Sequence, residues 1–138
     1  MIRVTVEPDA APSDIQEVES GLRDFNAVVI GPAHQRAVRI FLREDDRIAG
    51  GLLGEIRWRW MYVAKLWVAE SLRGKGYGRK LITAAEAHAR EEGCIGIYLD
   101  TFEYQARPFY EKLGFELFGT LEGYPPGYRQ FHLAKRLS

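Results

Sequence analysis

Apolar and polar residues alternate or recur with clear periods along most of this chain, and these periods predict a succession of strands and helices. Ile2–Val6 alternates with period two, which predicts a first strand. Apolar residues then recur three and four positions apart over Ile15–Phe25, which predicts an amphipathic helix. Ala37–Leu42 and Ile48–Ile56 flank a polar turn and predict a pair of antiparallel strands. Tyr62–Val68 predicts the next strand.

Three glycines interrupt the second strand of that pair, at Gly50, Gly51 and Gly54. Glycine weakens a packed strand because it contributes no side chain, and it lets another backbone come close. We therefore expect a bulge or a close backbone approach in this strand.

The second half of the chain predicts one strand–helix–strand unit, then a short helix and a hairpin. Leu81–Ala89 places its apolar residues on one helical stripe, and Ile95–Leu99 follows as a strand. A strand, a crossover helix and a second strand form a right-handed unit whose two strands are parallel. Ala106–Leu113 repeats at helical spacing, and Phe115–Leu121 with Tyr128–Leu133 predicts a last antiparallel pair. The predicted fold class is therefore α/β, with a mixed, mostly antiparallel sheet and one central parallel βαβ step.

The loop after the Tyr62–Val68 strand combines glycines with cations and reads Arg73-Gly74-Lys75-Gly76-Tyr77-Gly78-Arg79. Glycine permits positive φ and lets a ligand reach backbone N–H groups. A helix that begins here points its unpaired N–H groups and the positive end of its dipole into the loop. Such a place favours phosphate. A purely structural turn would not need the cations, so the loop predicts an anion site.

Two well-known phosphate loops do not match this spacing. A P-loop needs four residues between its first glycine and a Gly-Lys pair followed by Ser or Thr, and no such string occurs. The dinucleotide fingerprint has glycines at its first, third and sixth positions, but the sixth position counted from Gly74 is Arg79. That fingerprint also belongs to a sheet with several βαβ units, and this chain has room for about one.

Length and charge narrow the class of protein. The 138 residues, 46% apolar and 28% charged, suit a single domain spanning residues 1–138. Nineteen basic and nineteen acidic residues give a formal net charge of zero, which argues against nucleic acid as a partner. The one cysteine, Cys94, excludes an internal disulfide and suits a reducing compartment. No signal pattern and no apolar run of membrane length occur, so we expect a cytoplasmic protein without a membrane partner.

A second motif, taken with the glycine loop, resembles a known family. It reads Ala106-Arg107-Pro108-Phe109-Tyr110-Glu111-Lys112-Leu113-Gly114-Phe115. The two motifs resemble the signatures of the GNAT N-acetyltransferase superfamily, Arg/Gln-x-x-Gly-x-Gly/Ala and roughly Ala-x-x-Leu/Phe-Tyr-x-Lys-x-Gly-Phe. The matching residues are Arg73, Gly76 and Gly78 in the first motif, and Ala106, Phe109, Tyr110, Lys112, Gly114 and Phe115 in the second. The order of elements is similar along nearly the whole chain, and the resemblance implies helices on both faces of the sheet.

The resemblance implies acetyl-CoA as co-substrate and no metal. The residues that it places around the pyrophosphate are Arg73, Gly74, Lys75, Gly76, Tyr77, Gly78 and Arg79, at the helix N-terminus. It implies that the strand end Leu66-Trp67-Val68 splays from its parallel neighbour and pairs with the pantetheine arm like an added strand, and that the Val68 N–H polarises the acetyl carbonyl. Phe109 is expected beside the coenzyme, and Tyr110 takes the family's general-acid position. From the pattern alone, Tyr110 is better interpreted as a core aromatic residue on the stripe with Phe109.

The sequence leaves the proton acceptor open. Attack on a thioester needs a neutral amine, so a base must take a proton from the ammonium form. Glu55 is the first candidate and Asp100 the second, and either is equally interpreted as a surface carboxylate. Many family members have Asn three residues before Ala106, where this chain has Glu103. A carboxylate cannot donate that hydrogen bond, so the role is not transferred, and Glu103 is expected to face either the acceptor amine or solvent.

These observations predict direct transfer of acetyl to a primary amine of a small molecule. The aromatic residues expected on the acceptor side are Trp58, Trp60, Trp67, Tyr104 and Tyr124. They suit a cationic amine through cation–π contacts. Alternatively, the tryptophans among them fill the face of the sheet or a subunit interface. Cys94 lies at the far end of the long helix from the loop, a poor position for an acetyl carrier. The alternatives are an acyl-CoA-binding sensor without catalysis, acetylation of a protein amine, and a module whose loop binds another phosphate such as a nucleotide. Exposed strand edges are compatible with a homodimer.

Overall fold

The computed structural model describes residues 1–137, which divide into two compact units. The first unit is Met1–Ala33, and the second begins at His34. The prediction of a single domain stays a prediction, and each unit is described by itself below.

The first unit contains one helix, α1 (Pro12–Ile30), after an irregular segment. The helix predicted from apolar spacing is confirmed, and it ends at Gly31, which has φ +83° and donates its N–H to the Ala27 carbonyl. The strand predicted at Ile2–Val6 is wrong, because these residues are exposed and belong to no strand within the described chain. Alternation favours an extended backbone but cannot supply the neighbouring strand that a ladder of hydrogen bonds requires.

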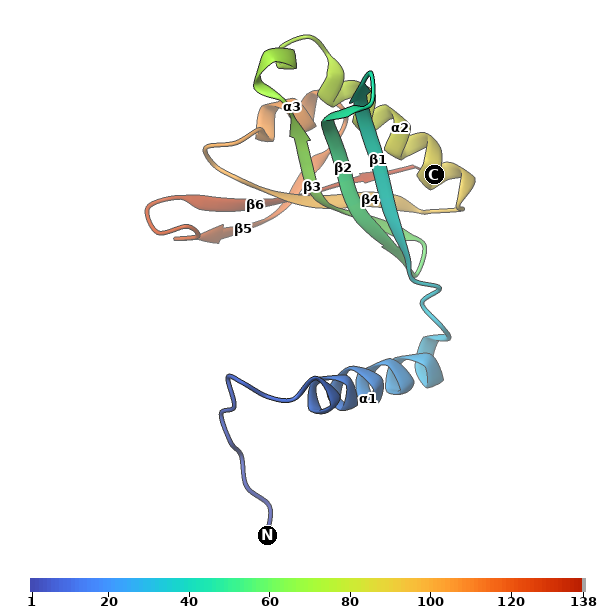
Figure 1. Ribbon diagram of the computed structural model, residues 1–138, viewed down its shortest axis with the longest axis vertical. Helices are drawn as coiled ribbons and strands as arrows, with labels where there is room; N and C mark the ends of the chain where they lie inside the picture. Colours follow the sequence, from blue (N-terminus) through green and yellow to red (C-terminus); the bar gives the residue numbers. More distant parts are fainter. Residues whose placement is uncertain (138) are drawn as a thin grey trace. The chain divides into compact units, whose positions relative to one another are not determined.

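The second unit is built on a six-stranded mixed sheet (Figure 1). Its strands are β1 (Arg36–Glu44), β2 (Arg47–Arg57), β3 (Trp60–Val68), β4 (Gly96–Phe102), β5 (Glu116–Glu122) and β6 (Arg129–Arg136). Its helices are η1 (Glu70–Leu72), α2 (Tyr77–Glu91) and α3 (Arg107–Lys112). The strands lie in the order β1-β2-β3-β4-β6-β5, with β3 and β4 parallel and the other neighbouring strands antiparallel. The predicted mixed sheet with a central parallel step is confirmed.

Helix α2 buries one stripe against strands β1 to β4. The stripe consists of Leu81, Ile82, Ala85 and Ala89, as the spacing predicts. These side chains join the inward residues of the central strands in one core, with Leu52, Ile56, Met61, Ile97 and Leu133 fully buried. Because α1 belongs to the other unit, the expectation of helices on both faces stays a prediction.

Gly50 and Gly54 let β2 and β3 approach closely where the sheet is irregular. A Cβ on Gly50 would lie 2.7 Å from the Trp67 carbonyl oxygen, and a Cβ on Gly54 would collide with the Tyr62 carbonyl oxygen. The register of the two strands shifts between Leu53 and Gly54. The expected bulge and close backbone approach are therefore both confirmed.

Candidate active site

The parallel strands β3 and β4 separate partway along β3 and open a cleft. Their pairing runs from Trp60 opposite Gly96 to Val63 opposite Leu99 and stops there, while β3 continues to Val68. The register shift against β2 leaves the next residue of β3, Ala64, without a residue opposite it on β2. A bulge bends the strand that contains it, so the rest of β3 turns away from β4. The splayed strand end that the family resemblance implies is therefore present.

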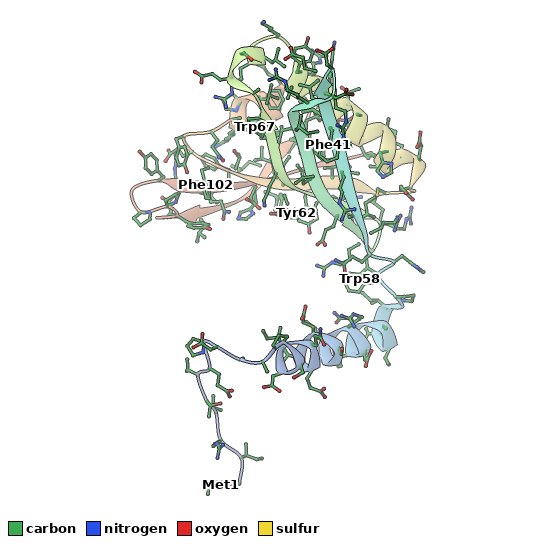
Figure 2. The ribbon with its side chains drawn as sticks, viewed as in Figure 1. Met1, Phe41, Trp58, Tyr62, Trp67 and Phe102 are labelled. Carbon is green, nitrogen blue, oxygen red and sulfur yellow. The ribbon has the colours of Figure 1, made fainter. Side chains whose placement is uncertain are left out.

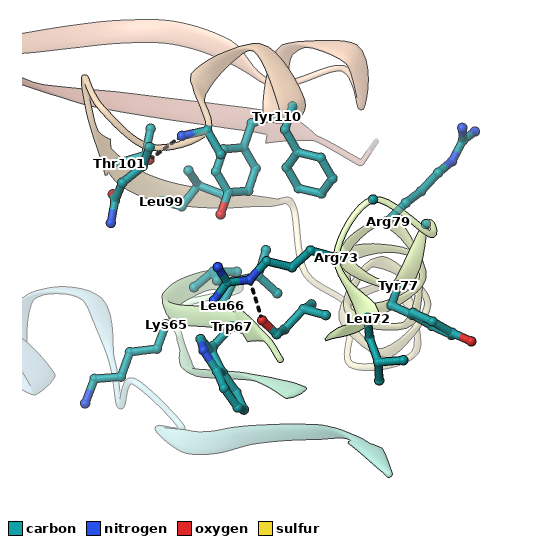
Figure 3. Close-up of a pocket in the computed structure, with 18 of the residues that line it drawn as sticks. Lys65, Leu66, Trp67, Leu72, Arg73, Tyr77, Arg79, Leu99, Thr101 and Tyr110 are labelled. Atoms are coloured by element: carbon teal, nitrogen blue, oxygen red, sulfur yellow. Dashed lines mark hydrogen bonds between the residues drawn. The ribbon is translucent and has the colours of Figure 1, made fainter. Parts of the chain in front are cut away.

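The cleft has a volume of about 730 Å³ and is lined by β3, the glycine loop, β4 and α3 (Figure 3). This volume lies within the range of small-molecule and cofactor sites. The predicted site residues that line it are Leu66, Trp67, Val68, Arg73, Gly74, Gly76, Tyr77, Gly78, Arg79, Asp100, Phe109 and Tyr110. Lys75 and Glu55 are the predicted site residues that do not line it.

Backbone groups at the end of β3 point into this cleft. Ala69 donates its N–H to the Ala49 carbonyl at 2.8 Å, so the backbone of residue 69 faces β2. Because successive residues of a strand direct their backbone groups to opposite edges, the N–H and C=O of Val68 face away from β2. The Val68 carbonyl indeed accepts a hydrogen bond from Nε of Arg73 at 2.9 Å. The Val68 N–H is thus positioned to donate to an acyl oxygen in the cleft.

The glycine loop leaves its backbone open at the start of α2. Gly74 and Gly76 have φ of +74° and +87°, and a Cβ on either would meet nothing within 4 Å. Gly76 is the N-cap of α2, and no side chain caps this helix end. Three cations flank the exposed amides, and none of them forms an ion pair within residues 1–137; they are Arg73, Lys75 and Arg79. Open N–H groups, a helix dipole and cations without a carboxylate partner together fit a diphosphate.

The two sequence motifs meet where Gly78 faces Phe109. A Cβ on Gly78 would lie 3.3 Å from the Phe109 ring, tighter than ordinary van der Waals contact. The third glycine of the loop therefore serves packing, because it lets α3 come close to the start of α2. This contact places Tyr110 beside the loop.

Tyr110 belongs to both the core and the cleft. Its side chain is 7% exposed, and its ring packs edge-on against Phe109 and Phe115, with centroids 5.1 and 5.8 Å away. Figure 3 shows its hydroxyl directed into the cleft, across from Leu66. Burial, followed by the negative charge of Asp100, raises the pKa of Tyr110 to about 12. The phenol is therefore protonated at neutral pH and available as a proton donor.

Asp100 lies at the edge of the same cleft, and Tyr62 holds it in place. The Tyr62 hydroxyl donates to Oδ2 of Asp100 at 2.7 Å. Burial first, then this hydrogen bond and the carboxylate charge, raise the pKa of Tyr62 to about 12. The phenol therefore remains a donor at neutral pH, and Oδ1 of Asp100 accepts no hydrogen bond from a side chain within residues 1–137. No local sequence pattern predicts this pair, whose members are 38 residues apart.

Glu55 and Glu103 each have a partner outside the cleft. Nε2 of Gln35 donates to Glu55 at 2.7 Å. Arg129 donates to one oxygen of Glu103 from Nε and Nη2, at 3.1 and 2.7 Å, and this pairing lowers the pKa of Glu103. The expectation that Glu103 faces an amine or solvent overlooked this ion pair, which joins residues 26 positions apart.

Two of the aromatic residues expected near the acceptor lie at the other end of the sheet. Trp60 begins β3 and packs edge-on against Tyr98, and Trp58 lies in the turn before it. Trp60 and Val68 are eight residues apart, roughly 26 Å along a strand. Figure 2 shows Trp58 and Trp67 at opposite ends of the second unit. Neither Trp58 nor Trp60 lines the cleft, so their acceptor role stays a prediction, whereas Trp60 packs on the sheet against Tyr98, as the alternative expects.

Comparisons with known proteins agree with this geometry. Residues 7–115 match the model of the acetyltransferase (GNAT) family. Blasticidin-S acetyltransferase of Streptomyces morookaense is 45% identical over 95 residues, which cover 68% of this chain and 70% of that protein. A crystal structure of a candidate acetyltransferase from Agrobacterium tumefaciens has a TM-score of 0.90 at 32% identity, covering 99% of this chain and 100% of its own. A candidate streptothricin acetyltransferase of Bacillus anthracis, solved with acetyl coenzyme A, has a TM-score of 0.64 at 23% identity, covering 71% and 62%.

A splayed parallel pair with an open glycine loop and a buried phenol defines an acyltransferase site. The chain belongs to the GNAT acetyltransferase family. It is an N-acetyltransferase, and acetyl-CoA is the co-substrate that the family and the cleft support. Among residues 1–137, no helix is long and apolar enough to cross a membrane, and no group of His, Cys, Asp and Glu could hold a metal ion.

Proposed function

We propose that this enzyme transfers acetyl from acetyl-CoA directly to a primary amine of a small cationic molecule. One observation carries the proposal: the loop amides, the Tyr110 hydroxyl and the Asp100 carboxylate all border one cleft. The relative named for blasticidin S supports a small acceptor. The sensor alternative does not account for a protonated phenol and a positioned carboxylate in the same space.

The residues of the cleft divide the chemistry among them. Asp100 holds the acceptor ammonium and first takes one proton from it, which frees the nitrogen lone pair to attack the acyl carbon and form the new N–C bond. The Val68 N–H stabilises the negative charge that develops on the acyl oxygen, a role in which one lost donor costs about 3 kcal/mol. Tyr110 donates its proton to the sulfur as the C–S bond breaks, and the second proton lost by the nitrogen restores the phenol. The products are the N-acetylated amine and the free thiol of coenzyme A.

A covalent acetyl-enzyme on cysteine is disfavoured by the position of Cys94. Its side chain is 6% exposed, and burial raises the pKa of its thiol. Cys94 follows the C-terminal end of α2, whereas the cleft lies at the N-terminal end of this helix. A thiol that is buried and protonated there is a weak nucleophile. Direct transfer in a ternary complex therefore remains the proposed route.

Asp100 is the proposed base in preference to Glu55. Asp100 lines the cleft and lies close enough to Tyr110 to raise the pKa of that phenol. Glu55 lies outside the cleft lining and already accepts a hydrogen bond from Gln35. The base therefore belongs to the strand that borders the coenzyme cleft.

The experiment measures thiol release from acetyl-CoA with blasticidin S, spermidine, an aminoglycoside and a lysine peptide. We expect turnover with a small amine and none with the peptide. Asp100→Asn should lower kcat/KM about 100-fold, whereas Glu55→Gln should change it less than about threefold. Turnover of the peptide alone would contradict the small acceptor. A larger loss of kcat/KM in Glu55→Gln than in Asp100→Asn would identify Glu55 as the base.

A homodimer and a cytoplasmic location remain predictions. Strands β1 and β5 are the two edges of the described sheet, and an exposed edge can pair with another copy. Sedimentation velocity of the whole chain measures the oligomeric state directly.

A further inference from the structure

Four aromatic side chains form a cluster just beyond the coenzyme cleft. They are Phe102, Tyr104, Tyr124 and Tyr128, and they are called the aromatic cluster below. The rings of Phe102 and Tyr104 are stacked, with centroids 5.7 Å apart and planes 20° apart. Tyr124 meets Phe102 edge-on at 5.2 Å, and Tyr128 meets Tyr104 edge-on at 5.0 Å.

Three of the four side chains in the aromatic cluster are exposed although their rings are large, and Phe102 is half-buried. Tyr104 is 57% exposed, and Tyr124 and Tyr128 are each 47% exposed. None of its members belongs to the buried core or to the lining of the coenzyme cleft. Exposed groups of large apolar side chains commonly mark binding surfaces. The core therefore does not account for this cluster.

Ordered contacts hold the two segments of the aromatic cluster together. The Glu103 N–H donates to the Arg129 carbonyl at 2.8 Å, and the side chains of the same two residues form the ion pair described above. In the β5–β6 turn, Tyr124 donates its N–H to the Tyr128 carbonyl at 3.1 Å, and Tyr128 donates its own to the Pro125 carbonyl at 2.8 Å. These hydrogen bonds therefore hold the four rings in place before any ligand binds.

The aromatic cluster adjoins the proposed amine site along β4. Ile97, Leu99 and Thr101 are buried, whereas Asp100 and Phe102 alternate with them on the opposite face of the strand. Two residues along a strand span roughly 7 Å. Figure 2 shows Phe102 on the side of the sheet that carries the β5–β6 hairpin. An amine held at Asp100 can therefore place a ring against Phe102 if two or three bonds separate the ring from the nitrogen.

We propose that the aromatic cluster is an acceptor subsite for a planar aromatic ring of the amine substrate. The inference rests on the proposed function, because it takes Asp100 as the place of the reacting amine. Stacked and edge-on aromatic pairs contribute about 0.5–1.5 kcal/mol beyond the area that they bury. An aromatic ring should therefore be preferred to a saturated ring of the same size.

The test compares 2-phenylethylamine with 2-cyclohexylethylamine as acceptors, by thiol release from acetyl-CoA. The wild-type enzyme should favour the aromatic amine about 3- to 10-fold in kcat/KM. Tyr104→Leu should bring this ratio to about 1 while the KM for acetyl-CoA and the Tm stay unchanged. Phe41→Leu is the matched control, since Phe41 is 47% exposed, lies on β1 and belongs to neither site. If Tyr104→Leu fails to fold, Tyr124→Leu takes its place.

A second measurement separates this inference from the proposed function. Saturation-transfer NMR detects the ring protons of 2-phenylethylamine on the protein loaded with coenzyme A, without any turnover. Signals that vanish in Tyr104→Leu but persist in Phe41→Leu support the subsite even if no amine is acetylated. In that case only the proposed acetyl transfer would be wrong, and the subsite would stand. Equal kcat/KM for the two amines, or ring signals that are absent or unaffected by Tyr104→Leu, would overturn the subsite.

Discussion

At the scale of single residues, Tyr110 shows how one side chain serves packing and chemistry together. Its ring fills the core beside Phe109 and Phe115, and its hydroxyl reaches the cleft. The burial that stabilises the ring also keeps the phenol protonated, because a phenolate would lose its hydration there. The two interpretations of Tyr110 from sequence, core aromatic and general acid, are therefore compatible.

Replacing Tyr110 with Phe tests the proton-donor role. The ring contacts remain in Tyr110→Phe, so we expect an unchanged fold and a loss of about 100-fold or more in kcat, because the thiolate must leave without a proton. Steady-state kinetics with thermal unfolding as the control checks both expectations. A kcat within threefold of the wild type would remove Tyr110 from the mechanism.

The pH dependence offers a second test of Tyr110. Its folded pKa of about 12 is raised above the ordinary value of 10, so the phenol is fully protonated below about pH 10 and ionises only above that. We therefore expect that ionisation of Tyr110 does not lower kcat between pH 8 and pH 10. Any fall in kcat within this range should also be present in Tyr110→Phe. A descending limb in that range which the variant abolishes would show that the phenol ionises much earlier.

At the scale of elements, the site depends on irregularities at the ends of regular elements. The register shift in β2 and β3 precedes the splay, and left-handed Gly76 opens the start of α2. A regular parallel pair would satisfy its own backbone groups and leave none for a ligand. The helix end supplies N–H groups for the same reason, since its first turn has no partners within the helix.

Gly76→Asp tests the loop as the diphosphate site, and Gly93 provides a matched control. Both glycines have positive φ, +87° and +75°, and a Cβ on either would meet open space, but Gly93 lies at the far end of α2. Backbone strain should therefore lower the stability of Gly76→Asp and of the control Gly93→Asp by about 1 kcal/mol each. Only Gly76→Asp should weaken coenzyme A binding, by more than tenfold in calorimetry, because its carboxylate opposes the phosphates.

Gly76→Asn separates charge from strain in the same experiment. Asparagine tolerates positive φ and carries no charge, so its affinity for coenzyme A should lie between those of the wild type and Gly76→Asp. Equal affinity in the wild type and Gly76→Asp would place the diphosphate elsewhere.

At the scale of the whole molecule, one crossover brings the parts of the site together. Strand β3, α2 and β4 form the parallel step, and the cleft opens where its two strands part. Helix α3 then brings the second sequence motif into contact with the glycine loop, because Phe109 packs against Gly78. Binding in this cleft therefore contacts segments from residue 63 to residue 110 and should stabilise the second unit as a whole.

Thermal unfolding with ligands tests this coupling. Acetyl-CoA at 100 times its Kd should add about 2.7 kcal/mol, which corresponds to a rise of roughly 12 °C in Tm for a unit of this size. ATP at the same concentration should raise Tm by less than about 2 °C, because it lacks the pantetheine arm that pairs with β3. An equal rise with ATP would favour a nucleotide site instead.

The sequence by itself determined the features that depend on neighbouring residues. Apolar spacing located α1 and α2, and the glycines marked both the loop and the bulge, because local φ/ψ preferences and side-chain periods act within a few residues. Tertiary structure alone decided which distant side chains meet: Tyr62 with Asp100, and Glu103 with Arg129. It also decided that Ile2–Val6 forms no strand and that Trp60 packs against Tyr98 and does not line the cleft. Such outcomes depend on strand order and register, which arise from pairings between segments that the chain brings together only when it folds.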